Sequence, residues 1–136
     1  MKVYLAHNYE ARDWLAEKIV PELEAAGIEV TSSWIKKAKP IDPYHPDLQR
    51  TEAIQDIEDV RRADVIALFT NQFGKRPGRG KYVELGIALA LDKTVILVGS
   101  AATNADTVFY YMPSIIKVSS LKQLIANVHK EEMINV

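Results

Sequence analysis

Short apolar segments alternate along the whole chain with longer segments that have helical spacing. The apolar segments predict strands at residues 2–6, 28–34, 64–70, 94–99 and 115–118. Helices are expected at residues 10–26 and 47–63, in the stretch that ends at residue 91, and from about residue 121. Such strands pair in parallel through right-handed crossovers. We therefore predict an α/β fold, a doubly wound, flavodoxin-like parallel sheet of five strands in the order 2-1-3-4-5 with helices on both faces.

Prolines and glycines set the expected boundaries of these elements. Pro21 lies inside the first helical segment and is expected to kink or interrupt it, and Gly27 is expected to close it. Residues 36–46, which include three prolines, form the longest predicted irregular stretch. Further loops are expected at residues 71–79 and 100–113, and long loops in compact domains are often functional.

Composition limits the class of protein. The chain has 136 residues, of which 48% are hydrophobic and 26% charged, and this suits one domain over residues 1–136. Its net charge of -1 provides no field to hold a nucleic acid polymer or an anionic membrane. The lack of cysteine excludes disulfides and thiol catalysis, and three scattered histidines disfavour a zinc site. With no targeting segment or membrane span in the sequence, we expect a cytoplasmic protein.

The helix that ends at residue 91 contains an unusual acidic residue. Glu84 is the one ionisable side chain between Val83 and Leu91, in a helix that is apolar around most of its circumference. Such a helix packs on several sides, so the carboxylate must face a cavity, a partner or the amide end of its own helix. The unpaired N–H groups and the macrodipole at that end would keep it ionised. Glu84 is therefore either a helix-capping residue or a catalytic carboxylate.

The predicted topology gives Glu84 a set of neighbours. In doubly wound sheets, ligands bind beyond the carboxyl ends of the strands, at the switch point between strands one and three. His7, Asn8 and Tyr9 follow the first strand, and residues 71–79 follow the third. We expect both segments and the N-terminus of the Glu84 helix to surround one crevice, with Glu84 in its wall.

The helix at residues 47–63 supplies a second candidate carboxylate. Its apolar face is expected to consist of Ile54, Ile57 and Val60. On a helical wheel, Asp56 falls about 40° from Val60, at the border of this face. Two other acids of the helix are expected to project towards solvent, Glu58 and Asp59. Asp56 is thus either a group that points into the crevice or an ordinary solvated acid beside two arginines.

Four segments, in this order and spacing, resemble the nucleoside 2-deoxyribosyltransferase family over nearly the whole chain. They are Val3-Tyr4-Leu5-Ala6, residues 55–65, residues 83–90 and residues 107–113. The family's nucleophilic glutamate lies in a segment much like Val83 to Ala90, and its second catalytic carboxylate matches Asp56. The resemblance therefore implies that Glu84 is the nucleophile and that Asp56 assists it.

The implied reaction breaks or exchanges an N-glycosidic bond. It needs a nucleophile on one face of the sugar, stabilisation of an oxocarbenium-like centre, and a proton or hydrogen bond for the departing base. Glu84 would form a ribosyl ester that water resolves in a hydrolase and a second base resolves in a transferase. Asp56 would orient the sugar or the nucleophile, or shuttle the proton. Neither role needs a metal ion or an organic cofactor.

Residues near the predicted crevice and in the family's motifs are candidates for substrate binding. They are Tyr4, His7, Asn8, Tyr9, Arg79, Gly80, Lys81, Thr107 and Phe109. The two tyrosines are candidates for stacking on a base, although a core or rim position is an equal alternative for each. The basic residues at the start of the Glu84 helix, together with Arg76, predict a site for a 5'-phosphate, with a solvated basic loop as the alternative.

Two positions depart from the family's pattern. Some members carry a base-contacting aspartate six positions before the nucleophile, where this chain has Gly78. Many carry an asparagine, contributed across a subunit interface, where this chain has Thr107. The sequence leaves open the base, the choice between hydrolysis and transfer, between a nucleoside and its 5'-monophosphate, and between ribose and 2'-deoxyribose.

The expected partner is a small nucleoside or nucleotide, and a second copy of the chain. The apolar cluster at residues 108–112 is typical of an interface, and the family is commonly oligomeric. We therefore expect a homodimer or higher homo-oligomer with shared active sites. Two other functions stay open: a TIR-like NAD glycohydrolase, which also uses a glutamate on a flavodoxin-like sheet, and a non-catalytic nucleotide-binding sensor module.

Overall fold

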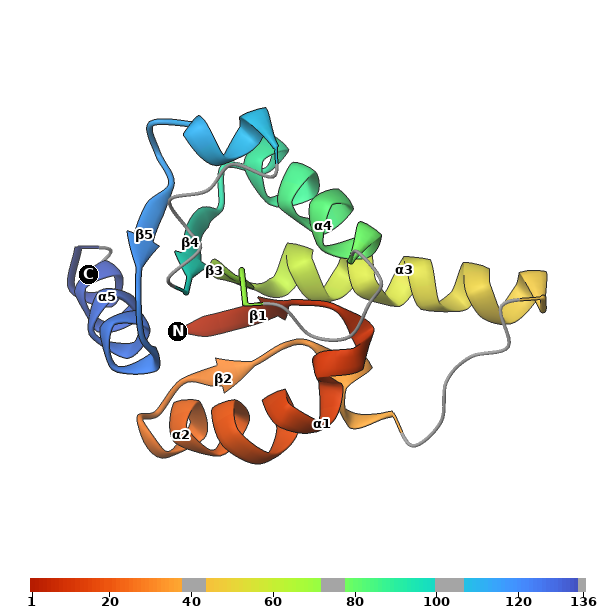
Figure 1. Cartoon of the computed structure of the whole chain (residues 1–136), viewed down its shortest axis with the longest axis horizontal. Coiled ribbons are helices and arrows are strands. Elements are labelled where there is room, and N and C mark those ends of the chain that lie inside the picture. Colours follow the sequence, from red (N-terminus) through yellow and green to blue (C-terminus); the bar gives the residue numbers. More distant parts are fainter. Residues whose placement is uncertain (38–43, 72–77, 100–106, 135–136) are drawn as a thin grey trace.

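The computed structural model describes residues 1–37, 44–71, 78–99 and 107–134. Within these residues five strands form one sheet in which every neighbouring pair is parallel. The strands are β1 (Lys2–Ala6), β2 (Glu29–Val30), β3 (Val65–Phe69), β4 (Thr94–Val98) and β5 (Ile116–Val118). Their order is β2-β1-β3-β4-β5, which confirms the predicted fold class and strand order (Figure 1).

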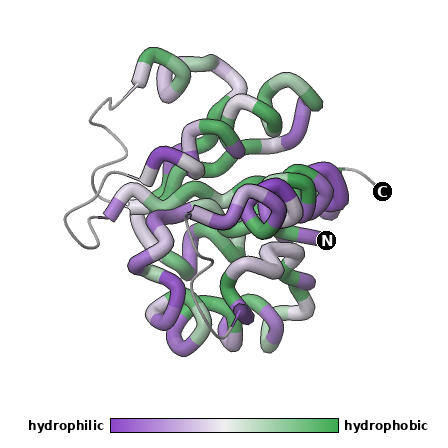
Figure 2. Tube along the Cα trace, turned by 90° about the vertical axis from the view of Figure 1, so that its right-hand side faces the viewer, coloured by the Kyte–Doolittle hydropathy of each residue, from purple (hydrophilic) through white to green (hydrophobic). Residues whose placement is uncertain are grey.

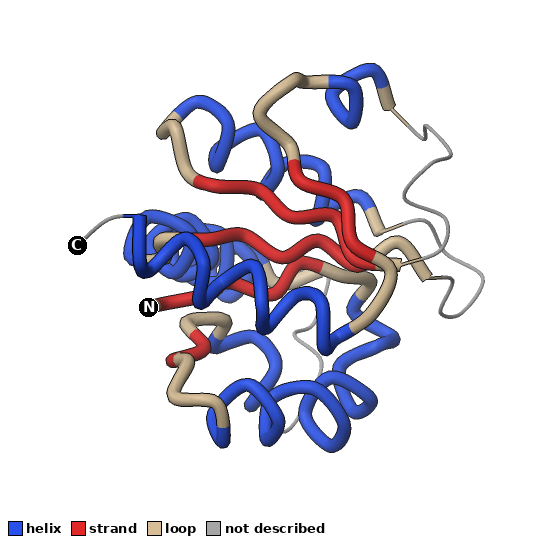
Figure 3. The backbone as a smooth tube through the Cα atoms, turned by 90° about the vertical axis from the view of Figure 1, so that its left-hand side faces the viewer, coloured by secondary structure: helices blue, strands red, loops and turns tan. Residues whose placement is uncertain are grey.

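Helices cover both faces of the sheet. The longer ones are α2 (Val20–Ala25), α3 (Pro46–Arg62), α4 (Arg79–Ala90) and α5 (Leu121–Ile134). In Figure 1, α2 lies on one side of β1 and β2, and α3 and α4 lie on the other. Figure 3 shows the strands running through the middle of the molecule with helices around them. Among the described residues, no helix combines the length and the apolar character that a membrane span requires.

The core follows from burial of the sheet on both faces. All five residues of β3 are buried, and in β1 only Lys2 is exposed. Figure 2 shows hydrophobic residues along the central strands and hydrophilic residues mostly on the outer helices. A parallel sheet with helices on both faces needs such continuous apolar strands, so the prediction of a doubly buried strand at β3 is confirmed.

The predicted second strand, residues 28–34, is wrong in length. Only Glu29–Val30 is a strand, and the last backbone bond to β1 is from Thr31 N–H to the carbonyl oxygen of Val3, at 2.9 Å. The chain then turns into a short 3-10 helix, η3 (Ser33–Lys36). Side chains of residues 32 and 34 bond the backbone of β1 there, so this edge needs no further strand.

The first helical segment is interrupted where the sequence predicts. It consists of η1 (Tyr9–Ala11), α1 (Arg12–Trp14), a π-helical turn η2 (Leu15–Ile19) and then α2. The wide turn lies just before Pro21, whose ring cannot donate a backbone bond and clashes with the preceding turn. Gly27, with φ of 81°, closes the segment as expected.

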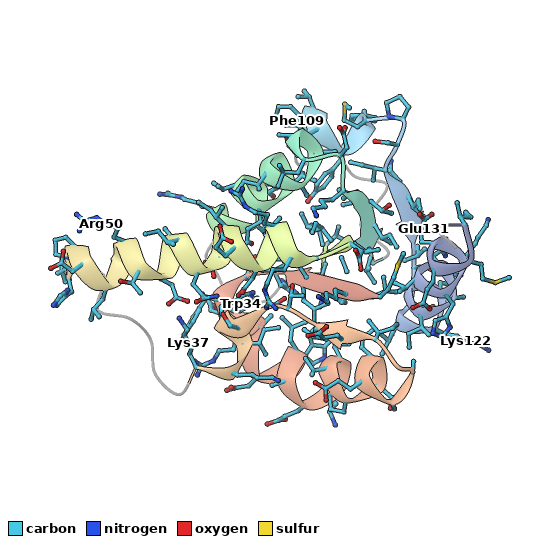
Figure 4. All side chains as sticks on the ribbon, turned by 180° about the vertical axis from the view of Figure 1, so that it is seen from behind. Trp34, Lys37, Arg50, Phe109, Lys122 and Glu131 are labelled. Carbon is cyan, nitrogen blue, oxygen red and sulfur yellow. The ribbon has the colours of Figure 1, made fainter. Side chains whose placement is uncertain are left out.

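The predicted buried face of α3 is only partly right. Val60 is buried as predicted, but Ile54 is 56% exposed and Ile57 is also exposed, whereas Asp59, which was expected in solvent, is fully buried. The inward side of α3 includes the buried Asp59 and Val60 and the partly buried Asp56, and Ala63, directly after the helix, is also buried. Hydrogen bonds from η3 to the Asp59 carboxylate decide the rotation of the helix, and they outweigh the burial of two isoleucines. The N-terminal half of α3 extends beyond the sheet, with Arg50 near its end (Figures 1 and 4).

The predicted loops fall mostly outside the described ranges. This applies to most of residues 36–46 and 71–79, to half of residues 100–113, and to Arg76 of the proposed phosphate site. The described part of the last loop includes a 3-10 helix, η5 (Val108–Tyr111).

Candidate active site

A hydrogen bond between β1 and α4 forms the centre of the site. The Tyr4 hydroxyl donates a short hydrogen bond to Oε2 of Glu84. Tyr4 is fully buried in the middle of β1, and Glu84 is 9% exposed on the inward side of α4. Within the described residues the start of α4 has no side-chain cap, and the Glu84 carboxyl accepts from Tyr4 instead. This geometry excludes the helix-capping alternative for Glu84.

The sequence of α4 explains why Glu84 points inwards. The buried residues of this helix are Lys81, Glu84, Leu85 and Ala88, spaced at three and four positions. Leu85 and Ala88 belong to the hydrophobic core, so the face that they define brings Glu84 over the sheet. The buried residues before and after Glu84 in α4 therefore fix the direction of its carboxyl group.

Asp56 of α3 lies next to this pair. It is partly buried, and one carboxylate oxygen, Oδ1, is buried without a hydrogen-bond partner among the described residues. An ion pair between Lys37 and Glu52 lies one helical turn away. A buried acceptor without a partner carries a desolvation cost that a bound hydroxyl group would remove. Asp56 is thus placed to receive a hydrogen bond from a ligand.

The two carboxyl groups have raised pKa values. Burial raises the pKa of Glu84 to about 8, the Tyr4 hydrogen bond opposes this, and the charges of Asp56 and Asp59 add to it. Burial also raises the pKa of Asp56 to about 6, with contributions from Glu52 and Asp59. Near neutral pH these shifts favour a protonated Glu84 beside an ionised Asp56. Burial and the negative charge of Glu84 also raise the pKa of the Tyr4 hydroxyl, which remains a donor.

His7 lies directly after β1, and both of its ring nitrogens make hydrogen bonds to neighbouring residues. Its Nδ1 accepts from the Asn8 N–H at 2.7 Å, so its Nε2 carries the proton and donates to Asn71 Oδ1 at 3.0 Å. The ring stacks on Phe69 with centroids 5.8 Å apart. Burial and the nearby charge of Lys81 lower the pKa of His7 to about 4. His7 therefore cannot supply a proton near neutral pH.

Asn8 joins the end of β1 to the start of α4. It is buried, and a Cβ atom placed on Gly78 would lie 2.1 Å from its Oδ1. Gly78 is the residue that precedes α4. It stands where some family members carry a base-contacting aspartate, and here the Asn8 side chain occupies the space that a side chain at that position would need.

We expect Gly78→Ala to destabilise the protein by about 1–3 kcal/mol, because Asn8 and its backbone must move to admit the methyl group. Gly80→Ala is the matched control. A Cβ atom there meets nothing within 4 Å, so alanine should stabilise α4 by about 0.5–1 kcal/mol. Urea unfolding of both variants measures the difference, and equal stabilities would contradict the close contact at Gly78.

Tyr9 lies at the rim of the site. It is half exposed, its hydroxyl accepts from Arg12 Nη1 at 2.8 Å, and the guanidinium group lies 5.1 Å from its ring centroid. Its ring is also 6.4 Å from that of Trp34, which is buried and donates from Nε1 to the Leu5 carbonyl oxygen. Figure 4 shows Trp34 and Lys37 on the same side of α3. This rim offers an aromatic surface held by a cation.

The other predicted binding residues lie in the first turn of α4 and on, or just before, η5. Arg79 and Gly80 are exposed at the first turn of α4, whereas Lys81 is buried with its Nζ 5.3 Å from the Tyr82 ring centroid. On η5, the Thr107 Oγ1 accepts from the Phe109 N–H, and Phe109 is exposed. The link from η5 to α4 is made by Tyr110 against Tyr82, with centroids 6.4 Å apart. Thr107 is thus half-buried and Phe109 is exposed.

Two features of the site were missed from the sequence. Tyr4 was predicted as a substrate-binding residue, but its hydrogen bond to Glu84 was not predicted. The sequence feature that could have indicated this bond is a tyrosine hydroxyl group in a strand whose other buried residues are aliphatic. Asp59 was assigned to solvent, although it lies one turn after Asp56 on the same side of α3. Among the described residues, no group of three or more His, Cys, Asp or Glu side chains is arranged to hold a metal ion.

The five-stranded parallel sheet with helices on both faces places the chain among the doubly wound α/β proteins, which bind ligands beyond the carboxyl ends of their strands. The family model described as nucleoside 2-deoxyribosyltransferase matches residues 3–132, and the chain belongs to this family. Family and fold support action on the N-glycosidic bond of nucleosides. No curated protein matches the chain by sequence.

Solved structures share the fold at low sequence identity. The 2-deoxyribosyltransferase of Bacillus psychrosaccharolyticus has a TM-score of 0.70 and 19% identity, over 92% of this chain and 90% of its own. The CMP N-glycosidase of Clostridium botulinum has a TM-score of 0.62 and 18% identity, over 96% and 99%. A conserved protein from Enterococcus faecalis V583 has a TM-score of 0.68 and 14% identity, over 96% and 98%. These likenesses establish the fold.

Proposed function

We propose that this protein breaks or exchanges the N-glycosidic bond of 2'-deoxynucleosides or their 5'-monophosphates, with Glu84 as the nucleophile. The observation that carries the proposal is the buried Glu84 carboxyl, which is held by the Tyr4 hydroxyl and lies beside Asp56. The family to which the chain belongs supports the same chemistry.

In the proposed first step, Glu84, which holds a proton near neutral pH, gives this proton up to the departing base, and Oε1 of the resulting carboxylate attacks C1' of the sugar. The bond from C1' to the base nitrogen breaks, and its electron pair leaves with the base, which carries the proton away. Tyr4 holds Oε2 and so leaves Oε1 for the attack. In the second step, water or another base attacks C1', and the ester bond to Glu84 breaks. Asp56, ionised near neutral pH, accepts a hydrogen bond from a sugar hydroxyl through its free Oδ1.

The direct test is incubation of the protein with each deoxynucleoside and each deoxynucleoside 5'-monophosphate, with and without an acceptor base. Release of free base supports the proposal, and formation of a new nucleoside with an acceptor base assigns a transferase. NAD serves as the comparison substrate. Turnover of NAD without turnover of any deoxynucleoside or deoxynucleotide would replace the proposal with a NAD glycohydrolase.

We also propose that the first turn of α4 binds a 5'-phosphate. The supporting features are Arg79, which is exposed at the start of the helix, and the buried cation of Lys81 two residues later. Unpaired amides and cations at a helix N-terminus together favour a phosphate group. A nucleotide is also the compound named for the Clostridium botulinum enzyme.

Arg79→Ala should raise the KM for a deoxynucleoside monophosphate by roughly ten- to a hundredfold, because a charge-assisted hydrogen bond is worth about 1.5–3 kcal/mol. The KM for the free nucleoside should stay nearly unchanged. The control is Arg61→Ala, which removes an exposed arginine near the C-terminal end of α3. Equal kcat/KM for a nucleoside and its monophosphate in the unmodified protein would reject this reading.

We propose that the active unit is a homo-oligomer in which η5 takes part in the interface. Four apolar side chains are exposed on and just after this short helix: Val108, Phe109, Tyr111 and Met112. Apolar clusters of this kind mark interfaces. Light scattering should show a dimer or larger species, and Phe109→Asp should shift it to the monomer and lower activity. A fully active monomer at low concentration would contradict the proposal.

A further inference from the structure

Asp59 is a buried carboxylate that the proposed chemistry does not use. Its exposed fraction is 0%, and it lies on α3 one turn after Asp56. Its Oδ2 accepts from the Ser33 N–H at 2.9 Å and from the Ser33 hydroxyl at 2.6 Å, and its Oδ1 accepts from Gln55 Nε2 at 2.9 Å. Arg62 approaches Oδ1 to 3.5 Å. A buried charge with this many donors is a fixed element of the structure, because breaking such a network leaves a charge without partners.

The segment that Asp59 holds replaces the missing end of β2. The Thr31 hydroxyl donates to the Asp59 carbonyl oxygen at 2.9 Å. Both the side chain and the backbone carbonyl group of Asp59 therefore accept hydrogen bonds from this segment. Beyond Thr31, the Leu5 N–H donates to the Ser32 hydroxyl oxygen at 2.5 Å, and Trp34 Nε1 donates to the Leu5 carbonyl oxygen at 3.1 Å. Side chains of this segment therefore bond both backbone groups of Leu5, where a longer strand would otherwise pair.

Leu5 directly follows Tyr4, which donates to Glu84. A continuous set of hydrogen bonds thus runs from Asp59 on α3, through residues 31–34, to the part of β1 that carries Tyr4. The same helix carries Asp56. The position of Asp56 relative to Glu84 therefore depends on how α3 is fixed to this edge of the sheet.

We propose that Asp59 is a positioning residue, which fixes α3 to the segment at residues 31–34 so that Asp56 and the Tyr4 and Glu84 pair face the same sugar. The inference rests on the proposed function. It adds a residue that touches no substrate but sets the geometry of the two carboxyl groups, for which a displacement of about 1 Å can cost about a hundredfold in rate.

The charge of Asp59 gives a readout that a purely structural role would not move. The groups that act on the Glu84 carboxyl are Tyr4 from β1 and Asp56 and Asp59 from α3, and the charges of both aspartates raise its pKa. Around Asp56 the charged groups are Glu52, Asp59 and Lys37. Removing the Asp59 charge should therefore lower the pH at which Glu84 loses its proton.

The experiment compares Asp59→Asn with Glu58→Gln, which removes one negative charge from the exposed side of the same helix. We measure kcat and KM for the best substrate, the pH profile of kcat/KM, and the titration of the Glu84 carboxyl carbon by NMR. For Asp59→Asn we expect a loss of about tenfold or more in kcat, a smaller change in KM, and a lower titration midpoint for Glu84. Glu58→Gln should change none of these values substantially.

Ser33→Ala provides a second variant in case Asp59→Asn does not fold. It removes the 2.6 Å hydrogen bond to Asp59 but keeps the backbone bond, so a smaller loss of kcat is expected. The inference is overturned if a folded Asp59→Asn, or Ser33→Ala in its place, keeps the unmodified kcat. It is also overturned if the Glu84 titration in Asp59→Asn matches that in Glu58→Gln.

Failure of the proposed function would look different. An unmodified protein that releases no base from any substrate would refute the function, whereas the NMR titration would still decide whether Asp59 acts on Glu84. Activity in the unmodified protein together with an unchanged Asp59→Asn would refute only the positioning role.

Discussion

Glu84→Gln is expected to lower kcat by at least about a thousandfold while leaving the fold intact. Glutamine has nearly the same shape, and its side-chain oxygen can still accept from the Tyr4 hydroxyl. Its amide group is a poor nucleophile, so the ester with the sugar cannot form. Steady-state rates of base release, measured with the best substrate at saturating concentration, give the ratio.

Two controls make this result specific. Glu58→Gln removes an exposed carboxylate of α3 and should keep the unmodified rate. Thermal unfolding of Glu84→Gln should show a cooperative transition, so that a loss of rate is not a loss of fold. A folded Glu84→Gln that retains a rate near that of the unmodified protein would contradict the nucleophilic role.

The same substitution should also stabilise the protein in a way that grows with pH. Burial raises the pKa of Glu84 to about 8, above its ordinary value of 4.5. Between these two values the folded protein holds a proton that the unfolded chain has lost, so the free energy of unfolding falls as pH rises. The fall is about 1.4 kcal/mol per pKa unit, or a few kcal/mol in all, and it is complete above pH 8. Glutamine at this position removes the effect.

Urea unfolding at pH 5, 7 and 9 measures this prediction. The stability of Glu84→Gln relative to the unmodified protein should be smallest at pH 5 and largest at pH 9. Glu58→Gln is again the control, because it removes the same type of group from the surface. A difference that is independent of pH, or one equal to that of Glu58→Gln, would contradict a raised pKa at Glu84.

Much of the fold was predictable because it depends on local patterns. The order β2-β1-β3-β4-β5 follows from alternating apolar and helical segments and from the handedness of crossovers. The early end of β2 was not predictable, since Ile28, Val30 and Trp34 fit the two-residue spacing of a strand. The strand ends early because two side chains, from Ser32 and Trp34, satisfy the backbone of Leu5 in its place.

The candidate site was predictable only in part, for a related reason. Glu84 was conspicuous in the sequence as a single acid in an apolar helix, and its inward position follows from its neighbours in α4. The surroundings of Asp56 were not predictable from the sequence. The rotation of α3 depends on tertiary hydrogen bonds to Asp59, and these outweigh the exposure of Ile54. A helical wheel measures hydrophobicity alone and cannot rank an aspartate that accepts four hydrogen bonds above an isoleucine.

A covalent bond between Glu84 and the sugar distinguishes the proposed mechanism, and mass spectrometry of the intact protein detects this bond. The protein is mixed with a deoxynucleoside or its monophosphate, without an acceptor base, and quenched in acid during turnover. We expect a mass increase of one deoxyribosyl or deoxyribosyl phosphate group, located by peptide mapping on Glu84 and absent from Glu84→Gln. Rapid release of base with no adduct, or with an adduct on another residue, would contradict it.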